Sequence, residues 1–248
     1  MKTKAMFEKG RLLIIICSAF WITCLLSVKE SRGQLTPVNF DGAPALTPGQ
    51  LEASLFFGGS YLSWDGDVYV KGYLPGIKIG FGIAKGFDLK LTYSRGIYSY
   101  NFIGWSDWQD SKENNLTISP KVTLLKDIIA VQLPVTFILY KEYEDKMNVY
   151  YKFGPRFILS AHYRQYVEFN VSPFMDILVD SGNEPYYFAG GNLGFAFSSN
   201  LKRWSIRPEG YLSWPVFTKS ESSKEMIYGW GIAATFNFDL FKKPAATK

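Results

Sequence analysis

The fold is decided by residues 226–241, MIYGWGIAATFNFDLF. Every second residue from Met226 to Leu240 is apolar, and the residues between them are small or polar apart from Ile227. A period of two is typical of a β-strand whose two faces meet different surroundings. The same alternation recurs along most of the chain, so we predict an all-β fold with one apolar and one polar face in nearly every strand.

Residues 1–33 have the features of a cleaved export signal. A basic start precedes an apolar run of 17 residues from Leu12 to Val28, and Ser31-Arg32-Gly33 places small residues at the cleavage positions. A retained membrane anchor is the alternative, although the run is short for a spanning helix. Both cysteines, Cys17 and Cys24, lie in this segment. The mature chain is therefore predicted to use neither disulfides nor thiolate metal sites.

The net charge gives no sign of a nucleic-acid partner. Of the 27 basic and 22 acidic residues, six and two lie within residues 1–33, so the remainder carries 21 and 20. The basic character of the whole chain comes mostly from the segment that we expect to be removed. No basic patch is left that would predict nucleic-acid binding.

After residue 33 the chain has no apolar run long enough for a transmembrane helix. Without such helices a chain can span a membrane only as a closed β-barrel, because every backbone amide must be paired within hydrocarbon. We predict a transmembrane antiparallel up-and-down β-barrel of ten strands with lipid outside and a polar interior. An eight-stranded barrel and a soluble secreted β-sandwich are the alternatives.

The predicted organisation is a signal peptide (1–33), an extended periplasmic leader (34–49), the barrel (50–241) and a C-terminal tail (242–248). Lys85-Gly86 predicts a tight hairpin turn. The longer loops, such as 62–71 and 99–115, follow odd-numbered strands, which predicts that they face the cell surface. Proline removes a ladder donor, so we expect bulges or weak pairing at four outward positions: Pro120, Pro155, Pro173 and Pro208.

Several motifs together resemble a known class of protein. The export signal, the alternating strands, the Lys85-Gly86 hairpin, Phe153-Gly154-Pro155 and the run Arg207 to Tyr211 (RPEGY) resemble small porin-like outer-membrane β-barrel proteins of the type common in Bacteroidetes. The resemblance covers most of the mature chain. It implies a barrel in the cell outer membrane, with lipid and the barrel-assembly machinery as partners, and it implies no catalytic residue.

The polar faces of the predicted strands carry charges that must share the barrel interior. Isolated buried charges are costly, so we expect a lumenal network of ion pairs, with Arg207, Glu209, Lys152 and Arg156 as its first candidates. A narrow polar conduit for small solutes is the alternative. The full set is Glu52, Lys78, Asp88, Lys90, Lys121, Lys152, Arg156, Glu168, Asp176, Arg207 and Glu209.

Two predicted loops combine tryptophan with carboxylates. An exposed tryptophan can stack on a sugar ring while a carboxylate accepts hydrogen bonds from its hydroxyls, which makes a surface glycan or a small polar solute a candidate ligand. Anchoring at the membrane interface is the alternative. The residues are Trp64, Asp65, Trp105, Asp107 and Trp108.

Nothing in the sequence predicts catalysis, a cofactor or a metal site. The one histidine, His162, is placed in a periplasmic turn, away from the outer rim where an outer-membrane enzyme would need a base. We therefore expect a non-catalytic outer-membrane barrel with a structural or surface-interaction role and a largely plugged lumen, or a narrow porin-like channel. An outer-membrane enzyme with a site at the extracellular rim is the alternative.

Overall fold

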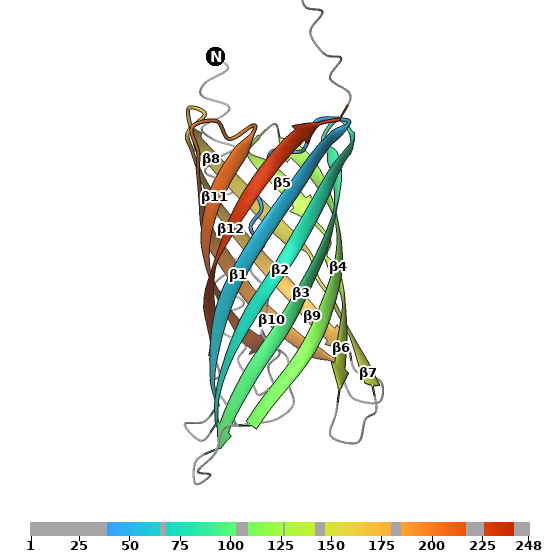
Figure 1. The fold of residues 1–248 in the computed structure, drawn as a ribbon, viewed down its shortest axis with the longest axis vertical. Helices are drawn as coiled ribbons and strands as arrows, with labels where there is room; N and C mark the ends of the chain where they lie inside the picture. The colour runs from blue at the N-terminus through green and yellow to red at the C-terminus, as the bar shows by residue number, and fades with distance from the viewer. Residues whose placement is uncertain are drawn as a thin grey trace, which may run out of the picture.

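The computed structural model describes residues 39–64, 68–102, 109–125, 127–141, 147–179, 185–216 and 226–240. Over these residues the chain forms twelve strand segments in one antiparallel sheet. The sheet closes on itself because the last strand pairs with the first, from Gln50↔Asp239 to Ser63↔Met226 (Figure 1). The segments are β1 (Gln50–Trp64), β2 (Val68–Ala84), β3 (Phe87–Phe102), β4 (Gln109–Leu125), β5 (Ile129–Gln132), β6 (Val135–Lys141), β7 (Met147–Phe153), β8 (Arg156–Tyr163), β9 (Val167–Val179), β10 (Tyr186–Phe197), β11 (Trp204–Val216) and β12 (Met226–Asp239).

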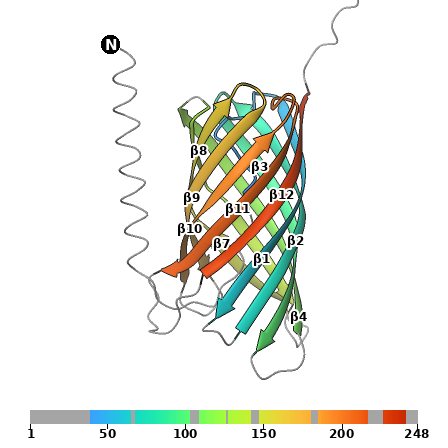
Figure 2. The same cartoon turned by 90° about the vertical axis from the view of Figure 1, so that its left-hand side faces the viewer.

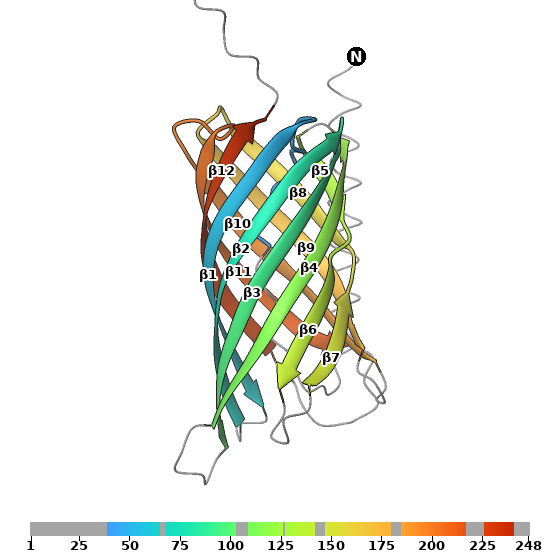
Figure 3. The ribbon, with the colours of Figure 1, turned by 45° about the vertical axis from the view of Figure 1, so that its right-hand side comes forward.

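Two of the barrel strands are each made of two segments. β5 and β6 both pair with β4, and β7 and β8 both pair with β9, so each couple acts as one interrupted strand. β6 and β7 continue β5 and β8 toward the other end of the cylinder (Figure 3). Counted this way, the described residues form the closed ten-stranded barrel that the sequence predicts.

The four predicted prolines all lie where the strand pairing is interrupted on one side. Pro155 lies in one of the two interrupted strands, and the other contains Pro134, which the sequence did not single out. Pro120, Pro173 and Pro208 lie inside continuous strands. Each is paired with the neighbouring strand on one side and falls in a gap of the pairing on the other side. This is the weak pairing that the sequence predicts, because proline has no N–H to donate.

The outer surface of the barrel is an apolar belt. Leu55 is 65% exposed and Phe236 is 49% exposed, whereas Lys152 and Glu209 are each 5% exposed. This is the reverse of a soluble fold, in which the apolar face would be inside. Closed antiparallel barrels with such a belt and a polar interior span outer membranes, so the chain is an outer-membrane β-barrel protein. Among the described residues, no helix is long and apolar enough to cross a membrane.

The two ends of the barrel differ in their connections. At one end, which we call the turn end, short connections such as 85–86 and 164–166 join the strands, and β1 begins and β12 ends there (Figure 2). Gly86 has a φ of 79°, as a tight hairpin requires. The opposite end, the loop end, carries the connections that contain residues 65–67, 103–108, 142–146, 180–184 and 217–225, which lie outside the described residues.

Two predicted loops are shorter than expected. The loop predicted at 62–71 and the loop predicted at 99–115 are mostly strand, because β1 and β2 pair as far as Trp64↔Val68 and β3 and β4 as far as Tyr100↔Gln109. The apolar alternation fades there while the backbone pairing continues. A wall that extends beyond the hydrocarbon does not need an apolar outer face, so the sequence pattern underestimates strand length.

The predicted periplasmic leader lies in part inside the barrel. Residues 39–47, which we call the lumenal segment, run within the cylinder before Gly49 leads into β1 (Figure 1). Phe40, Asp41 and Ala43 are almost completely buried there. The prediction of a leader outside the barrel is wrong for these residues. The predicted signal peptide (1–33) and tail (242–248) lie outside the described residues.

Candidate functional site: the lumen and its segment

All eleven residues of the predicted lumenal network point into the barrel. Ten of them are less than 9% exposed, and the Arg207 side chain is 13% exposed. They form separate clusters rather than one continuous network, and the largest cluster is built around a residue that the sequence did not single out.

That residue is Asp41 of the lumenal segment. Its Oδ1 accepts hydrogen bonds from the Nζ of Lys90 at 2.7 Å and of Lys121 at 3.1 Å. The amide of Gln132 donates to the other carboxylate oxygen at 3.3 Å. The three donors come from β3, β4 and β5, so one buried carboxylate ties the segment to three neighbouring strands. Charge-assisted hydrogen bonds of this kind are about twice as strong as neutral ones.

The lysines around Asp41 also hold the backbone of the segment. Lys121 donates to the carbonyls of Gly42 at 2.9 Å and Pro44 at 2.8 Å, and Lys78 donates to the carbonyl of Phe40 at 2.8 Å. A segment inside a barrel has no strand partner, and buried backbone groups must be paired. Side chains of the wall therefore replace the sheet as the partners of this backbone.

Two wall carboxylates complete this cluster. Glu52 lies 3.3 Å from the Nζ of Lys78 and 3.1 Å from that of Lys90. Asp88 lies 3.4 Å from the Nζ of Lys121 and accepts a hydrogen bond from the backbone N–H of Leu46 at 3.1 Å. The three lysines of this cluster therefore have three carboxylates as partners, and Asp41 of the lumenal segment is the third of these.

The start of the segment is fixed by Glu209. This carboxylate accepts hydrogen bonds from the backbone N–H groups of Asn39 and Phe40 and from the side-chain amide of Asn192. Phe40 has a φ of 50°, which is uncommon for a non-glycine residue. Its ring packs against Phe56, with the centroids 5.4 Å apart. These contacts hold the backbone in a conformation that it would otherwise avoid.

The four predicted first candidates all take part in lumenal clusters. Arg207 lies 3.5 Å from Glu168 on β9. Lys152 and Arg156 share the carboxylate of Asp176, at 3.8 and 3.5 Å. Residues on one face of one strand point into the lumen side by side, and their partners come from across the wall.

Glu168 is the centre of a further cluster near the turn end. Besides Arg207, it contacts the imidazole of His162 at 3.4 Å and accepts a hydrogen bond from the hydroxyl of Ser160 at 3.3 Å. Ser160 in turn accepts the backbone N–H of Ala43. A Cβ built on Gly42 would overlap the Glu168 carboxylate, so any other residue at this position would require that carboxylate to move. His162 lies in strand β8, opposite Glu168, and not in the predicted turn, which begins at Arg164.

Sequence reasoning missed Asp41 and Glu113. Glu113 accepts hydrogen bonds from the hydroxyl of Tyr98 and the amide of Asn115, and it was assigned to a loop. The signal for Asp41 was available, because it is the one charged residue in the predicted leader 34–49. A lone charge in an otherwise uncharged segment beside an unbalanced lumen indicates a counter-ion.

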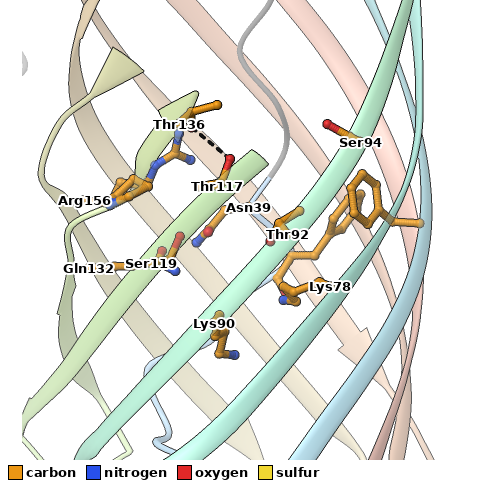
Figure 4. Close-up of a pocket in the computed structure, with 13 residues that line it drawn as sticks. Asn39, Lys78, Lys90, Thr92, Ser94, Thr117, Ser119, Gln132, Thr136 and Arg156 are labelled. Atoms are coloured by element: carbon orange, nitrogen blue, oxygen red, sulfur yellow. Dashed lines mark hydrogen bonds between the residues drawn. The ribbon is translucent and has the colours of Figure 1, made fainter. Parts of the chain in front are cut away.

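A small pocket lies between the lumenal segment and the wall of β2 to β8 (Figure 4). Its volume is about 40 Å³, which is room for about three water molecules at the ~10–15 Å³ that each needs. Lys78, Lys90 and Arg156 line it together with hydroxyl and amide side chains, and none of its described lining residues is acidic. The pocket is too small to be a channel for solutes.

The predicted surface-loop ligand contacts are outside what the structure describes. Asp65, Trp105, Asp107 and Trp108 fall in the omitted connections, and only the backbone of Trp64, at the end of β1, is described. The surface-binding hypothesis therefore stays a prediction.

The comparisons with known proteins concern the fold. No family model matches the sequence, and no curated protein matches it. The translocator domain of the autotransporter NalP from Neisseria meningitidis is similar at 9% identity and a TM-score of 0.48, over 76% of this chain and 88% of that one. The beta domain of the Bordetella autotransporter BrkA is similar at 11% identity and a TM-score of 0.47, over 77% of this chain and 100% of that one. The outer membrane protease OmpT from Escherichia coli is similar at 9% identity and a TM-score of 0.37, over 79% of this chain and 100% of that one. With TM-scores below 0.5, no role of these proteins is carried over to this chain.

Proposed function

We propose that this chain is a non-catalytic outer-membrane barrel whose own lumenal segment closes it to solutes. The observation that carries the proposal is the binding of Asp41 by Lys90 and Lys121, together with the lysine contacts to the segment's backbone. A passing solute would have to displace a segment that bonds to the wall on several sides. The lumen then acts in place of a hydrophobic core, and the role of the protein is structural or lies at the cell surface.

A non-catalytic role is supported by the surroundings of the one histidine. His162 lies near the turn end and contacts Glu168, which Arg207 also contacts. His162 is exposed at this end, opposite the end with the long connections, whereas an outer-membrane enzyme of the kind considered above would need its base at the extracellular rim. We further propose outer-membrane lipid and the barrel-assembly machinery as partners, a small polar solute or glycan as a loop ligand, and the Bacteroidetes-type porin-like class as the origin of the sequence motifs.

Conductance in planar bilayers tests the proposal. The full mature chain is expected to give no discrete current steps, whereas a variant that lacks residues 39–47 is expected to conduct. Asp41→Asn keeps the chain length and serves as a second variant if the deletion does not fold, and we expect it to give brief openings. Steady current steps from the unaltered protein would contradict the proposal and favour the narrow porin-like channel.

A further inference from the structure

We propose that the pocket beside the lumenal segment binds a small inorganic anion of halide size, which joins the segment to strand β8. The site is formed by Asn39 of the segment and by Lys78, Lys90 and Arg156 of the wall (Figure 4). The proposal does not depend on whether the barrel conducts, and it adds a ligand that the closure of the lumen does not require.

Two buried donors at this pocket have no acceptor. The side-chain amide nitrogen of Asn39 and the Nε of Arg156 are both out of contact with solvent, and neither has a hydrogen-bond partner. Arg156 is 3% exposed, so its position is not a surface one. A buried donor without a partner costs about 1–3 kcal/mol, and more when it is charged. Both residues line the same pocket, so one acceptor placed there can serve both.

The charge around the pocket selects an anion as that acceptor. Arg156, which shares the carboxylate of Asp176 with Lys152, lines the pocket, and none of the described lining residues is acidic. Lys78 and Lys90 add two more cations to the lining. Lys78 pairs with Glu52 and Lys90 with Asp41. Neither of these carboxylates lines the pocket. A small anion would satisfy the two donors within this cationic lining, and a water beside it would donate to the Oε1 of Gln132, a buried acceptor of the same pocket that has no partner.

The remaining lining groups suit such a ligand. Thr92, Ser94 and Ser119 line the cavity with hydroxyl-bearing side chains, together with the hydrogen-bonded pair of Thr117 and Thr136. Hydroxyls rotate to donate to whatever acceptor is present. At about 40 Å³ the pocket has room for about three water-sized groups. A halide with one or two waters fits, and a sugar acid such as gluconate does not.

Thermal unfolding of the mature chain in detergent micelles tests the proposal. Bromide or chloride should raise the unfolding midpoint in a saturable way over sodium gluconate at the same ionic strength. Arg156→Gln should abolish the difference between halide and gluconate. Arg207→Gln is the matched control, because this arginine pairs with Glu168 and does not line the pocket; it should keep the halide dependence.

Anomalous scattering from bromide in crystals of the unaltered protein gives a second measurement that does not depend on a variant's folding. A bromide peak between Asn39 and Arg156 is expected. A pocket that holds only water in bromide-soaked crystals would overturn the proposal, and so would equal unfolding midpoints in halide and in gluconate. A halide effect that survives Arg156→Gln would also overturn it, because the effect would then arise elsewhere.

Discussion

Asp41→Asn should release the lumenal segment from the wall without changing its shape. The substitution is nearly isosteric, but it removes the charge that pairs with Lys90 and Lys121. Removing one partner of a buried ion pair costs about 3–5 kcal/mol. Asparagine keeps one acceptor oxygen, so we take the lower end, about 3 kcal/mol. Since 1.4 kcal/mol corresponds to a factor of ten, the released state should become about a hundredfold more populated.

Labelling of a cysteine at Ala43 measures this population. Ala43 is fully buried, and both natural cysteines lie within residues 1–33, so Ala43→Cys would carry the one thiol of the mature chain. A maleimide reagent reacts only when the segment opens, and its rate follows the open population when opening is fast. Asp41→Asn should raise the labelling rate about a hundredfold in this background.

The control is Asp127→Asn, the same change at an exposed turn residue whose φ of 59° suits asparagine as well as aspartate. It should leave the labelling rate unchanged. If Asp41→Asn labels no faster than this control, the carboxylate does not hold the segment, and the account of the lumen given above is wrong.

Three further substitutions test other parts of the barrel through its free energy of unfolding in lipid vesicles. Gly42→Ala should cost about 1–3 kcal/mol by overpacking against Glu168, while Gly210→Ala, whose added Cβ would lie 3.7 Å from its nearest neighbour, should cost less; equal costs would exclude the overlap. Glu168→Gln should cost about 3 kcal/mol because it leaves Arg207 without its carboxylate, and an unchanged free energy would show that this pair does not matter. Leu55→Arg should cost about 2–4 kcal/mol if it lies at the bilayer midplane, and a neutral result would contradict a lipid-facing position.

The wall of the barrel was predictable because lipid imposes a rule on nearly every residue of a strand. The alternation is found as predicted over residues 226–239, in β12, and the Lys85-Gly86 turn is found in the β2–β3 hairpin. Lipid imposes this alternation of apolar and polar residues only along the part of each strand that crosses the hydrocarbon. For that reason the sequence placed Trp64 in a loop, although its backbone pairs with Val68 at the end of the sheet.

The lumenal partners were less predictable because alternation gives the face of a residue and not its neighbours. The side of the wall to which each charge belongs follows from a period of two. Which carboxylate each arginine meets depends on strand register, which sets Glu168 of β9 beside Arg207 of β11. Register is fixed by turns and bulges along the whole chain, such as the irregularities between Gly82 and Ala84 and between Thr123 and Leu125.

The charges of the strands explain why the lumenal segment lies inside the barrel, because the strands alone do not supply a counter-ion for every buried lysine. Lys78, Lys90 and Lys121 enter the lumen from adjacent strands, but the wall supplies only two nearby carboxylates, Glu52 and Asp88. A third lysine buried without a counter-ion would be costly. Asp41 of the lumenal segment is that third counter-ion. The wall as a whole is balanced once Glu113 is counted, so it is the local shortage around these three lysines, and not the total charge, that explains why the one charged residue of the predicted leader lies in the lumen.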